Sequence, residues 1–118
     1  MNGELSFFEL GVADAGRARE FYGSLFGWEF VEEGKGATIE TPNVPGGVHG
    51  GDAGASPSLF FRVDDLDAAL TRVRELGGEV GDYVSEDEDD PETVARFGRF
   101  VVCKDDQGSA FGLHEPPR

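Results

Sequence analysis

The chain has 118 residues, 38% of them hydrophobic, which is the size and composition of one globular domain. Its formal net charge of −14 argues against binding to nucleic acid or to anionic membrane surfaces, because its ten cations are scattered along the chain. No apolar run approaches the roughly twenty residues of a membrane span, and the N-terminus has no signal-peptide pattern, so we expect a cytoplasmic protein. The single cysteine, Cys103, excludes an intramolecular disulfide, and its apolar surroundings predict a packed core residue.

The first half of the chain predicts a strand, a helix and a hairpin. Residues 5–12 alternate as a strand, and Asp14 is a good N-cap for an apolar helical stripe over 15–26. Gly27 ends that helix, as a C-terminal glycine does by tolerating positive φ. Extended segments at 28–33 and 37–41 flank the turn Gly34-Lys35-Gly36 and predict the hairpin.

A glycine-rich segment, Gly46 to Gly51, follows this hairpin. It predicts either a short edge strand or an irregular loop, where a ligand or partner subunit could approach the backbone closely. It is not a phosphate loop, because neither a Lys-Ser/Thr pair nor a helix follows it.

The second half repeats this order. The pattern predicts a strand over 58–63, a helix over 66–76 that Gly77 and Gly78 end, and strands over 79–84, 97–104 and 109–114. The acidic run Ser85 to Glu92 predicts a solvated, mobile loop, and it lacks the spacing of a calcium site.

Four residue pairs at a constant offset of 51 indicate an internal duplication. They are Asp14 with Asp65, Ala18 with Ala69, Leu25 with Leu76, and Gly27 with Gly78. We therefore predict an α+β fold of two βαβββ modules, at about 4–52 and 57–115, that form a curved mixed sheet around a cavity with both helices outside. The open sheet edges also predict a homodimer.

Strand alternation assigns a face to each side chain. We expect Phe8, Leu10 and Val12, and likewise Leu59, Phe61 and Val63, to lie under the helices, together with Phe111 and Leu113. We expect Phe7, Glu9, Ser58, Phe60, Arg62, Ala110, Gly112 and His114 to face the cavity.

Four segments of the chain resemble the vicinal-oxygen-chelate superfamily of glyoxalases, bleomycin-resistance proteins and extradiol dioxygenases. They are Phe8-Glu9-Leu10 running into Asp14, the stretch Arg19 to Phe30 with its Phe-Tyr and Phe-Gly-Trp motifs, Val63 to Ala69, and Gly98 to Leu113 with its Gly-Arg-Phe strand and Asp-Gln-Gly turn. The resemblance spans nearly the whole chain and implies the paired-module fold.

The resemblance also implies positions for a divalent metal, and this chain departs from them. The metal enzymes of the superfamily use His and Glu, where this chain has Phe7, Ser58 and Gly112. Glyoxalase-type metal catalysis is thus disfavoured, and we predict no cofactor. A displaced triad of Glu9, His49 and His114 could instead hold zinc or iron, or Glu9 could simply pair with Arg62 or Arg99.

The sequence therefore predicts a glyoxalase- or bleomycin-resistance-like protein that binds a small, partly apolar or aromatic molecule without the usual metal. The expected cavity residues are Phe7, Glu9, His49, Ser58, Phe60, Arg62, Arg99, Gly112 and His114, while Trp28 could lie at the cavity mouth, at a subunit contact or in the core. The alternatives are an accessory domain with an empty cavity and an enzyme. The enzyme would be a metal-dependent lyase or dioxygenase at the displaced site, or an isomerase with Glu9 or His114 as general base.

Overall fold

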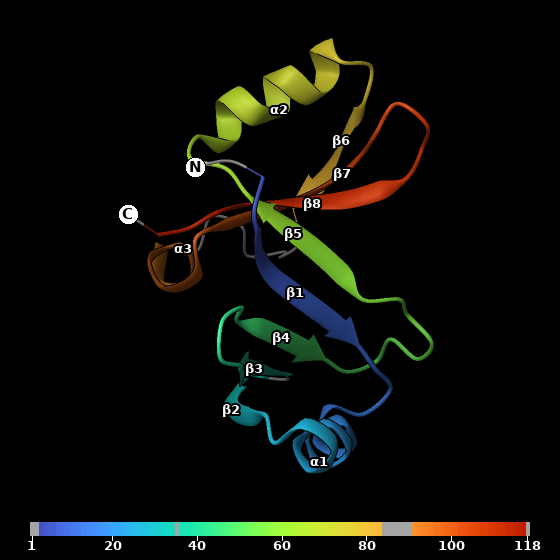
Figure 1. Ribbon diagram of the computed structural model, residues 1–118, viewed down its shortest axis with the longest axis vertical. Helices are drawn as coiled ribbons and strands as arrows, with labels where there is room; N and C mark the ends of the chain where they lie inside the picture. The colour runs from blue at the N-terminus through green and yellow to red at the C-terminus, as the bar shows by residue number, and fades with distance from the viewer. Residues whose placement is uncertain (1–2, 35, 84–90, 118) are drawn as a thin grey trace. The chain divides into compact units, whose positions relative to one another are not determined.

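The computed structural model describes residues 3–34, 36–83 and 91–117. The chain divides into two compact units. One unit is Phe7–Leu59, and the other combines Met1–Ser6 with Phe60–Arg118. The chain passes from one unit to the other within strands β1 (Leu5–Gly11) and β5 (Ser58–Arg62). Each unit combines four strands with helix on one face, so the predicted α+β class and the paired modules are confirmed (Figure 1). No described helix has the length and apolar character needed to span a membrane.

The Phe7–Leu59 unit contains α1 (Ala15–Phe26), β2 (Glu29–Glu33), β3 (Gly36–Glu40) and β4 (Gly46–His49) besides most of β1. β1 pairs in parallel with β4, β4 is antiparallel to β3, and β3 forms the predicted hairpin with β2. The part Gly46–His49 of the glycine-rich segment is therefore neither an edge strand nor a loop. It is a strand paired on both sides, and the small residues let it lie between two neighbours.

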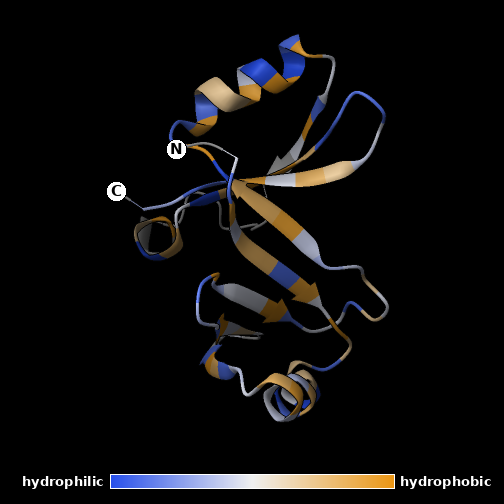
Figure 2. Cartoon of the chain, viewed as in Figure 1, coloured by the Kyte–Doolittle hydropathy of each residue, from blue (hydrophilic) through white to orange (hydrophobic). Residues whose placement is uncertain are grey.

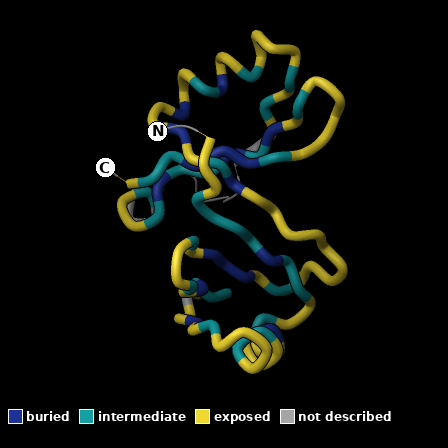
Figure 3. The backbone as a smooth tube through the Cα atoms, viewed as in Figure 1, coloured by how far each residue is buried: buried dark blue, intermediate teal, exposed yellow. Residues whose placement is uncertain are grey.

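Local signals in the sequence set the bounds of α1. The Asp14 carboxylate accepts a hydrogen bond from the Arg17 backbone N–H at 3.2 Å, and Gly27 adopts φ 75° while donating its N–H to the Gly23 carbonyl. The helix covers a core built from Leu10, Ala18, Phe30, Ile39 and Val48. Figure 2 shows β1 coloured mostly as apolar, and Figure 3 shows most of β4 as buried.

Trp28 belongs to this core. Its ring packs at 4.7 Å from Phe26, 5.4 Å from Phe8 and 5.7 Å from Tyr22, measured between ring centroids. Of the three places considered for Trp28, the core is therefore where the structure puts it, because the aromatic residues of α1 and β1 surround it.

The second unit contains α2 (Leu66–Glu75), β6 (Glu79–Tyr83), α3 (Pro91–Phe97), β7 (Arg99–Lys104) and β8 (Ala110–Glu115), with residues from β5. β5 pairs in parallel with β8, β8 is antiparallel to β7, and β7 is antiparallel to β6. Helix α2 packs on β6 and β8 over a core of Val63, Leu66, Leu70, Val101, Cys103 and Leu113. The burial of Cys103 also raises the pKa of its thiol, so the predicted packed cysteine is confirmed.

The structure corrects two local predictions in this unit. Pro91–Phe97 is a helix, so the acidic segment predicted as a loop ends in helical structure at Glu92, and β7 begins at Arg99 instead of Phe97. The remainder of that segment, 85–90, lies outside the described residues. At the end of α2 the glycine in the left-handed conformation is Gly77 (φ 92°). Gly77 is therefore the equivalent of Gly27, and the sequence offset between these two glycines is 50 instead of the predicted 51.

Candidate functional site

Two of the predicted site residues, Glu9 on β1 and His49 on β4, lie in direct contact. The parallel pairing sets Gly11 opposite His49, and this brings the His49 Nδ1 to 2.8 Å from the Glu9 Oε1. The Nε2 of the same ring lies 2.9 Å from the Asp52 Oδ2. When both carboxylates are ionised they can only accept, so both ring nitrogens then donate and His49 bridges the two acids as an imidazolium, a state that its raised pKa favours. Asp52 was not predicted, although its spacing from His49 in a glycine-rich stretch could have suggested it.

Contacts within the Glu9–His49–Asp52 cluster, together with burial, shift the pKa values of His49 and Glu9. Hydrogen bonds to Glu9 and Asp52 raise the pKa of His49 above its ordinary value, against a smaller opposing effect of burial. Burial raises the pKa of the Glu9 carboxyl, and the His49 contact only partly opposes this. The two pKa shifts therefore have different causes: the carboxylates favour the charged imidazole of His49, whereas burial disfavours the charged carboxylate of Glu9.

The face of this unit opposite α1 carries the cluster. Leu10 and Val48 point to the core under α1, so Phe7, Glu9, Gly47 and His49 share the other face. A Cβ on Gly47 would overlap the Glu9 Oε2 and lie 3.4 Å from the Phe7 Cζ. Glycine at this position is therefore what lets the carboxylate and the Phe7 ring edge meet over β4.

His114 lies in the other unit and is bound differently. Its Nε2 donates to the Phe97 carbonyl oxygen at 2.7 Å, and its Nδ1 accepts from the Ser6 hydroxyl at 2.9 Å. The ring stacks flat on Phe100, with 4.3 Å between centroids and 4° between planes. Burial lowers the pKa of His114, so the ring is neutral, and neither nitrogen has a lone pair to spare.

Phe60 and Gly112 form a packed pair in this second unit. The two residues lie opposite each other in the β5–β8 pairing, and a Cβ on Gly112 would overlap the Phe60 ring. Phe60 is 1% exposed and meets Phe100 edge to face at 5.2 Å between centroids. Phe60 was predicted as a cavity wall, but it is fully covered and fills the space that a side chain at 112 would need.

Arg99 and Arg62 each lie near carboxylates other than Glu9, and Arg62 is also the strand partner of His114. Arg99 lies on the α2 side of β7, within 3.3 Å of the Asp67 carboxylate and 3.8 Å of the Glu115 carboxylate. We therefore correct its prediction as a cavity residue, because Glu115 in turn accepts from the Leu66 N–H and ties Arg99 to the start of α2. Arg62 lies 3.7 Å from Asp64, and Ser58 is exposed. The partner of Glu9 is thus His49 and neither arginine.

The residues at the positions considered for a metal ion supply few available ligand atoms. Phe7 and Gly112 offer no ligand atom, and the space at Gly112 is filled. At the displaced triad, the structure brings Glu9 and His49 together, and the two nitrogens of His114 are engaged by the Ser6 hydroxyl and the Phe97 carbonyl. A metal at His49 would have to displace a proton that two carboxylates stabilise. Within the described ranges, no three His, Cys, Asp or Glu side chains are arranged to hold a metal.

Comparison with known proteins points to one group of folds. A family profile described as "Bleomycin resistance protein-like N-terminal" matches residues 5–42. Methylmalonyl-CoA epimerase from Mycobacterium tuberculosis superposes with a TM-score of 0.62 at 25% identity, over 98% of this chain and 89% of that one. Homoprotocatechuate 2,3-dioxygenase from Brevibacterium fuscum gives a TM-score of 0.66 at 20% identity, over 98% of this chain and 37% of that one. The fold is therefore the glyoxalase, bleomycin-resistance and dioxygenase fold.

A relative of known sequence aligns with nearly the whole chain. The anthracycline biosynthesis protein DnrV of Streptomyces peucetius is 30% identical over 134 aligned residues, covering 94% of this chain and 46% of the relative. The chain thus spans about half the length of the anthracycline biosynthesis relatives that it matches. Together with the fold, these matches indicate the vicinal-oxygen-chelate superfamily.

Proposed function

We propose that this protein binds a small, partly apolar or aromatic molecule and does so without the divalent metal of the superfamily. The observation that carries the proposal is the pair Phe60 and Gly112. The strand position that would supply the last metal ligand has no side chain, and the Phe60 ring occupies its space. The neutral, doubly hydrogen-bonded state of His114 two residues further along β8 supports the same reading.

The surface that we assign to the ligand is the Phe7 and Glu9 face of the first unit. Phe7 offers an aromatic edge, and Glu9 offers a polar atom that would orient a bound molecule. The names of similar proteins support a small ligand with an aromatic or acyl part: DnrV is named for anthracycline biosynthesis, and the B. fuscum structure holds 3,4-dihydroxyphenylacetate.

A fluorescence titration with the neutral aromatic probe N-phenyl-1-naphthylamine tests the proposal, alongside elemental analysis of the purified protein. We expect saturable binding that a chelator does not change, at less than 0.1 equivalent of transition metal. Phe7→Ala should weaken binding about tenfold, since burying one aromatic side chain contributes about 1.5 kcal/mol or more. Val31→Ala is the matched control, because Val31 lies on the same face but two strands away from Gly47. Binding that disappears with the chelator and returns with added metal would refute the proposal.

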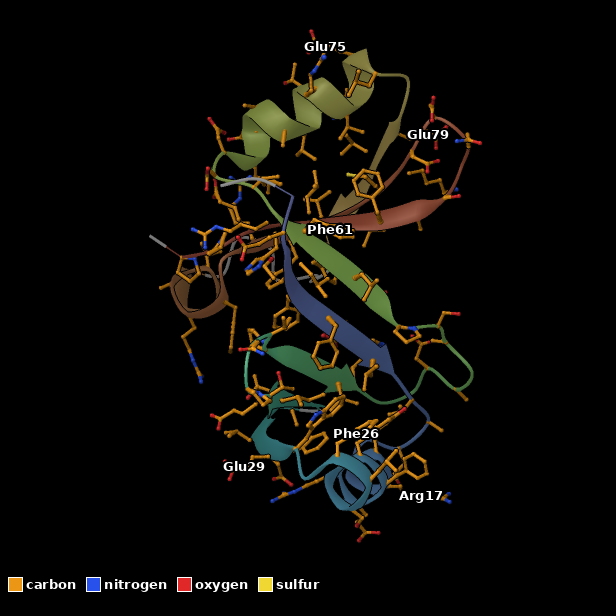
Figure 4. The ribbon with its side chains drawn as sticks, in the orientation of Figure 1. Arg17, Phe26, Glu29, Phe61, Glu75 and Glu79 are labelled. Carbon is orange, nitrogen blue, oxygen red and sulfur yellow. The ribbon has the colours of Figure 1, made fainter. Side chains whose placement is uncertain are left out.

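We also propose that two copies associate. Three large apolar side chains of α1, namely Phe21, Leu25 and Phe26, are 62%, 60% and 56% exposed, and Figure 4 labels Phe26 near the end of that helix. Covering such a patch is favourable, because burial removes apolar surface from water. Light scattering on a sizing column should give about twice the mass of 12.7 kDa, and a monomer at 100 μM would contradict this.

A further inference from the structure

Ser6 and His114 form a hydrogen-bonded pair in the second unit, at the start of β1 and near the end of β8. The Ser6 Oγ lies 2.9 Å from the His114 Nδ1, and the His114 Nε2 lies 2.7 Å from the Phe97 carbonyl oxygen. A carbonyl oxygen can only accept, so Nε2 carries the proton and Nδ1 presents its lone pair to the Ser6 O–H. A hydroxyl, an imidazole and a group that orients the imidazole are thus linked by two hydrogen bonds within one unit.

We propose that Ser6 is a nucleophile activated by His114, and that it accepts an acyl group from a small ester with a good leaving group. A hydroxyl within hydrogen-bond reach of a base, with the base itself oriented by a third group, is the arrangement that activates serine for acyl transfer. This activity goes beyond ligand binding, and it uses none of the residues of the Phe7 and Glu9 face.

Packing around His114 fixes the direction of its ring nitrogens. The ring is 6% exposed and stacks flat on Phe100, at 4.3 Å between centroids and 4° between planes. At the end of α3, a Cβ on Gly98 would overlap the Glu115 carbonyl oxygen, so the chain passes close to β8 and brings the Phe97 carbonyl onto the ring. Ser6 is only partly buried. The base is therefore held in place, while the hydroxyl that it activates is accessible from solvent.

The reaction balances with water as the second reactant. The Ser6 Oγ forms a bond to the ester carbonyl carbon, and its proton passes to the His114 Nδ1. The C–O bond to the leaving group then breaks, and the phenolate or alkoxide departs with the electron pair. Water attacks the acyl-serine in the same way, and release of the carboxylic acid restores the Ser6 hydroxyl. While the imidazolium exists, both of its nitrogens donate, and the Phe97 carbonyl favours this charged ring.

The strength of the base limits which esters can react. Burial lowers the pKa of His114, so its ring is a weaker base than an ordinary histidine. The leaving group must then supply part of the activation, as a phenolate does and an amine does not. The partial burial of Ser6 favours a small acyl group over a bulky one. The substrate class that fits this pair is therefore the aryl ester of a short carboxylic acid.

Arg62 supplies positive charge beside the pair. It is the strand partner of His114 on β5, and its charge also lowers the pKa of His114. A positive charge at this place would stabilise the negative oxygen that develops when Ser6 attacks the carbonyl. Four more charged residues lie along the elements that pack around His114, namely Glu4, Arg96, Arg99 and Glu115, and the last two lie 3.8 Å apart as an ion pair.

Hydrolysis of p-nitrophenyl acetate tests the proposal, together with mass spectrometry after treatment with diethyl p-nitrophenyl phosphate, which leaves a diethylphosphoryl group on an activated serine. We expect hydrolysis at least about tenfold faster than in buffer, and the phosphoryl group on Ser6. Ser6→Ala should lose both, and His114→Gln should bring both close to background. Ser24→Ala, at an exposed serine of α1, is the matched control and should keep the wild-type values. Ser6→Cys retains a nucleophile of similar size and should still be acylated.

The pH profile identifies the base. Because the pKa of His114 is lowered, the acid limb of the hydrolysis rate should lie below pH 6.5. Hydrolysis by His49 would instead give a limb above pH 6.5, since the pKa of that residue is raised. Thermal unfolding checks that each variant is folded. A phosphoryl group elsewhere than on Ser6, hydrolysis that persists in Ser6→Ala, or an acid limb above pH 6.5 would overturn the proposal.

Discussion

Replacing Gly112 with alanine should destabilise the protein although it adds one methyl group. The new Cβ would overlap the Phe60 ring and lie 2.5 Å from its Cε1, which no real Cβ contact shows. The ring cannot swing away cheaply, because Phe60 is 1% exposed and packs edge to face on Phe100. Overpacking of this kind costs about 1–3 kcal/mol, and a chain of this size should melt roughly 5–10 °C lower.

Calorimetric unfolding of matched variants checks this expectation. Gly23→Ala in α1 is the control, since its Cβ would meet nothing nearer than 3.6 Å and alanine favours a helix by about 1 kcal/mol. The double variant Phe60→Leu with Gly112→Ala should recover part of the loss, because the smaller side chain makes room. Unchanged stability of Gly112→Ala would refute the reasoning, since it would mean that the position has space for a ligating side chain after all.

Three further outcomes follow from the histidines and glycines. Gly47→Ala should push the Glu9 carboxylate away from His49, so the pKa of His49, measured by NMR titration, should fall back toward 6.5. The raised pKa of His49 contributes stability that is fully present below pH 6.5 and lost as pH rises through the folded pKa, so His49→Leu should cost most stability near pH 5.5 and least in alkali. His114 has the opposite sign: its lowered pKa removes stability as pH falls below 6.5, and His114→Phe should flatten that part of the pH dependence relative to wild type.

Patterns with a local cause were readable in the sequence. The helix over 15–26 was predicted to the residue, because Asp14 caps one end and Gly27 ends the other. The core side of β1 was predicted as well, since alternation alone puts Phe8, Leu10 and Val12 under α1. The same alternation was wrong for Leu59 on β5, which is 46% exposed. Helix α3 was missed because an acidic run reads as solvated coil, although Pro91 is a good first helical residue.

The contacts of the candidate site depend on packing that the sequence does not show. The pairing of β1 with β4 decides that Glu9 meets His49 and not an arginine, and a parallel register between distant segments leaves no local signature. The alternation of β5 correctly separates Phe60 from the helix side, yet it cannot tell an open wall from a ring packed onto Gly112. The face of Arg99 was predicted wrongly, because a shift of one residue along a strand moves a side chain to the opposite face of the sheet.

Long-range ¹H–¹⁵N spectra of the two histidines, recorded with and without one equivalent of Ni²⁺, test most directly the proposal that the protein works without the divalent metal. The structure predicts that His114 is a neutral ring with its proton on Nε2, that His49 is protonated at pH 6, and that neither signal changes on adding the ion. Broadening of both histidine signals at that single equivalent, together with a rise in melting temperature, would contradict it.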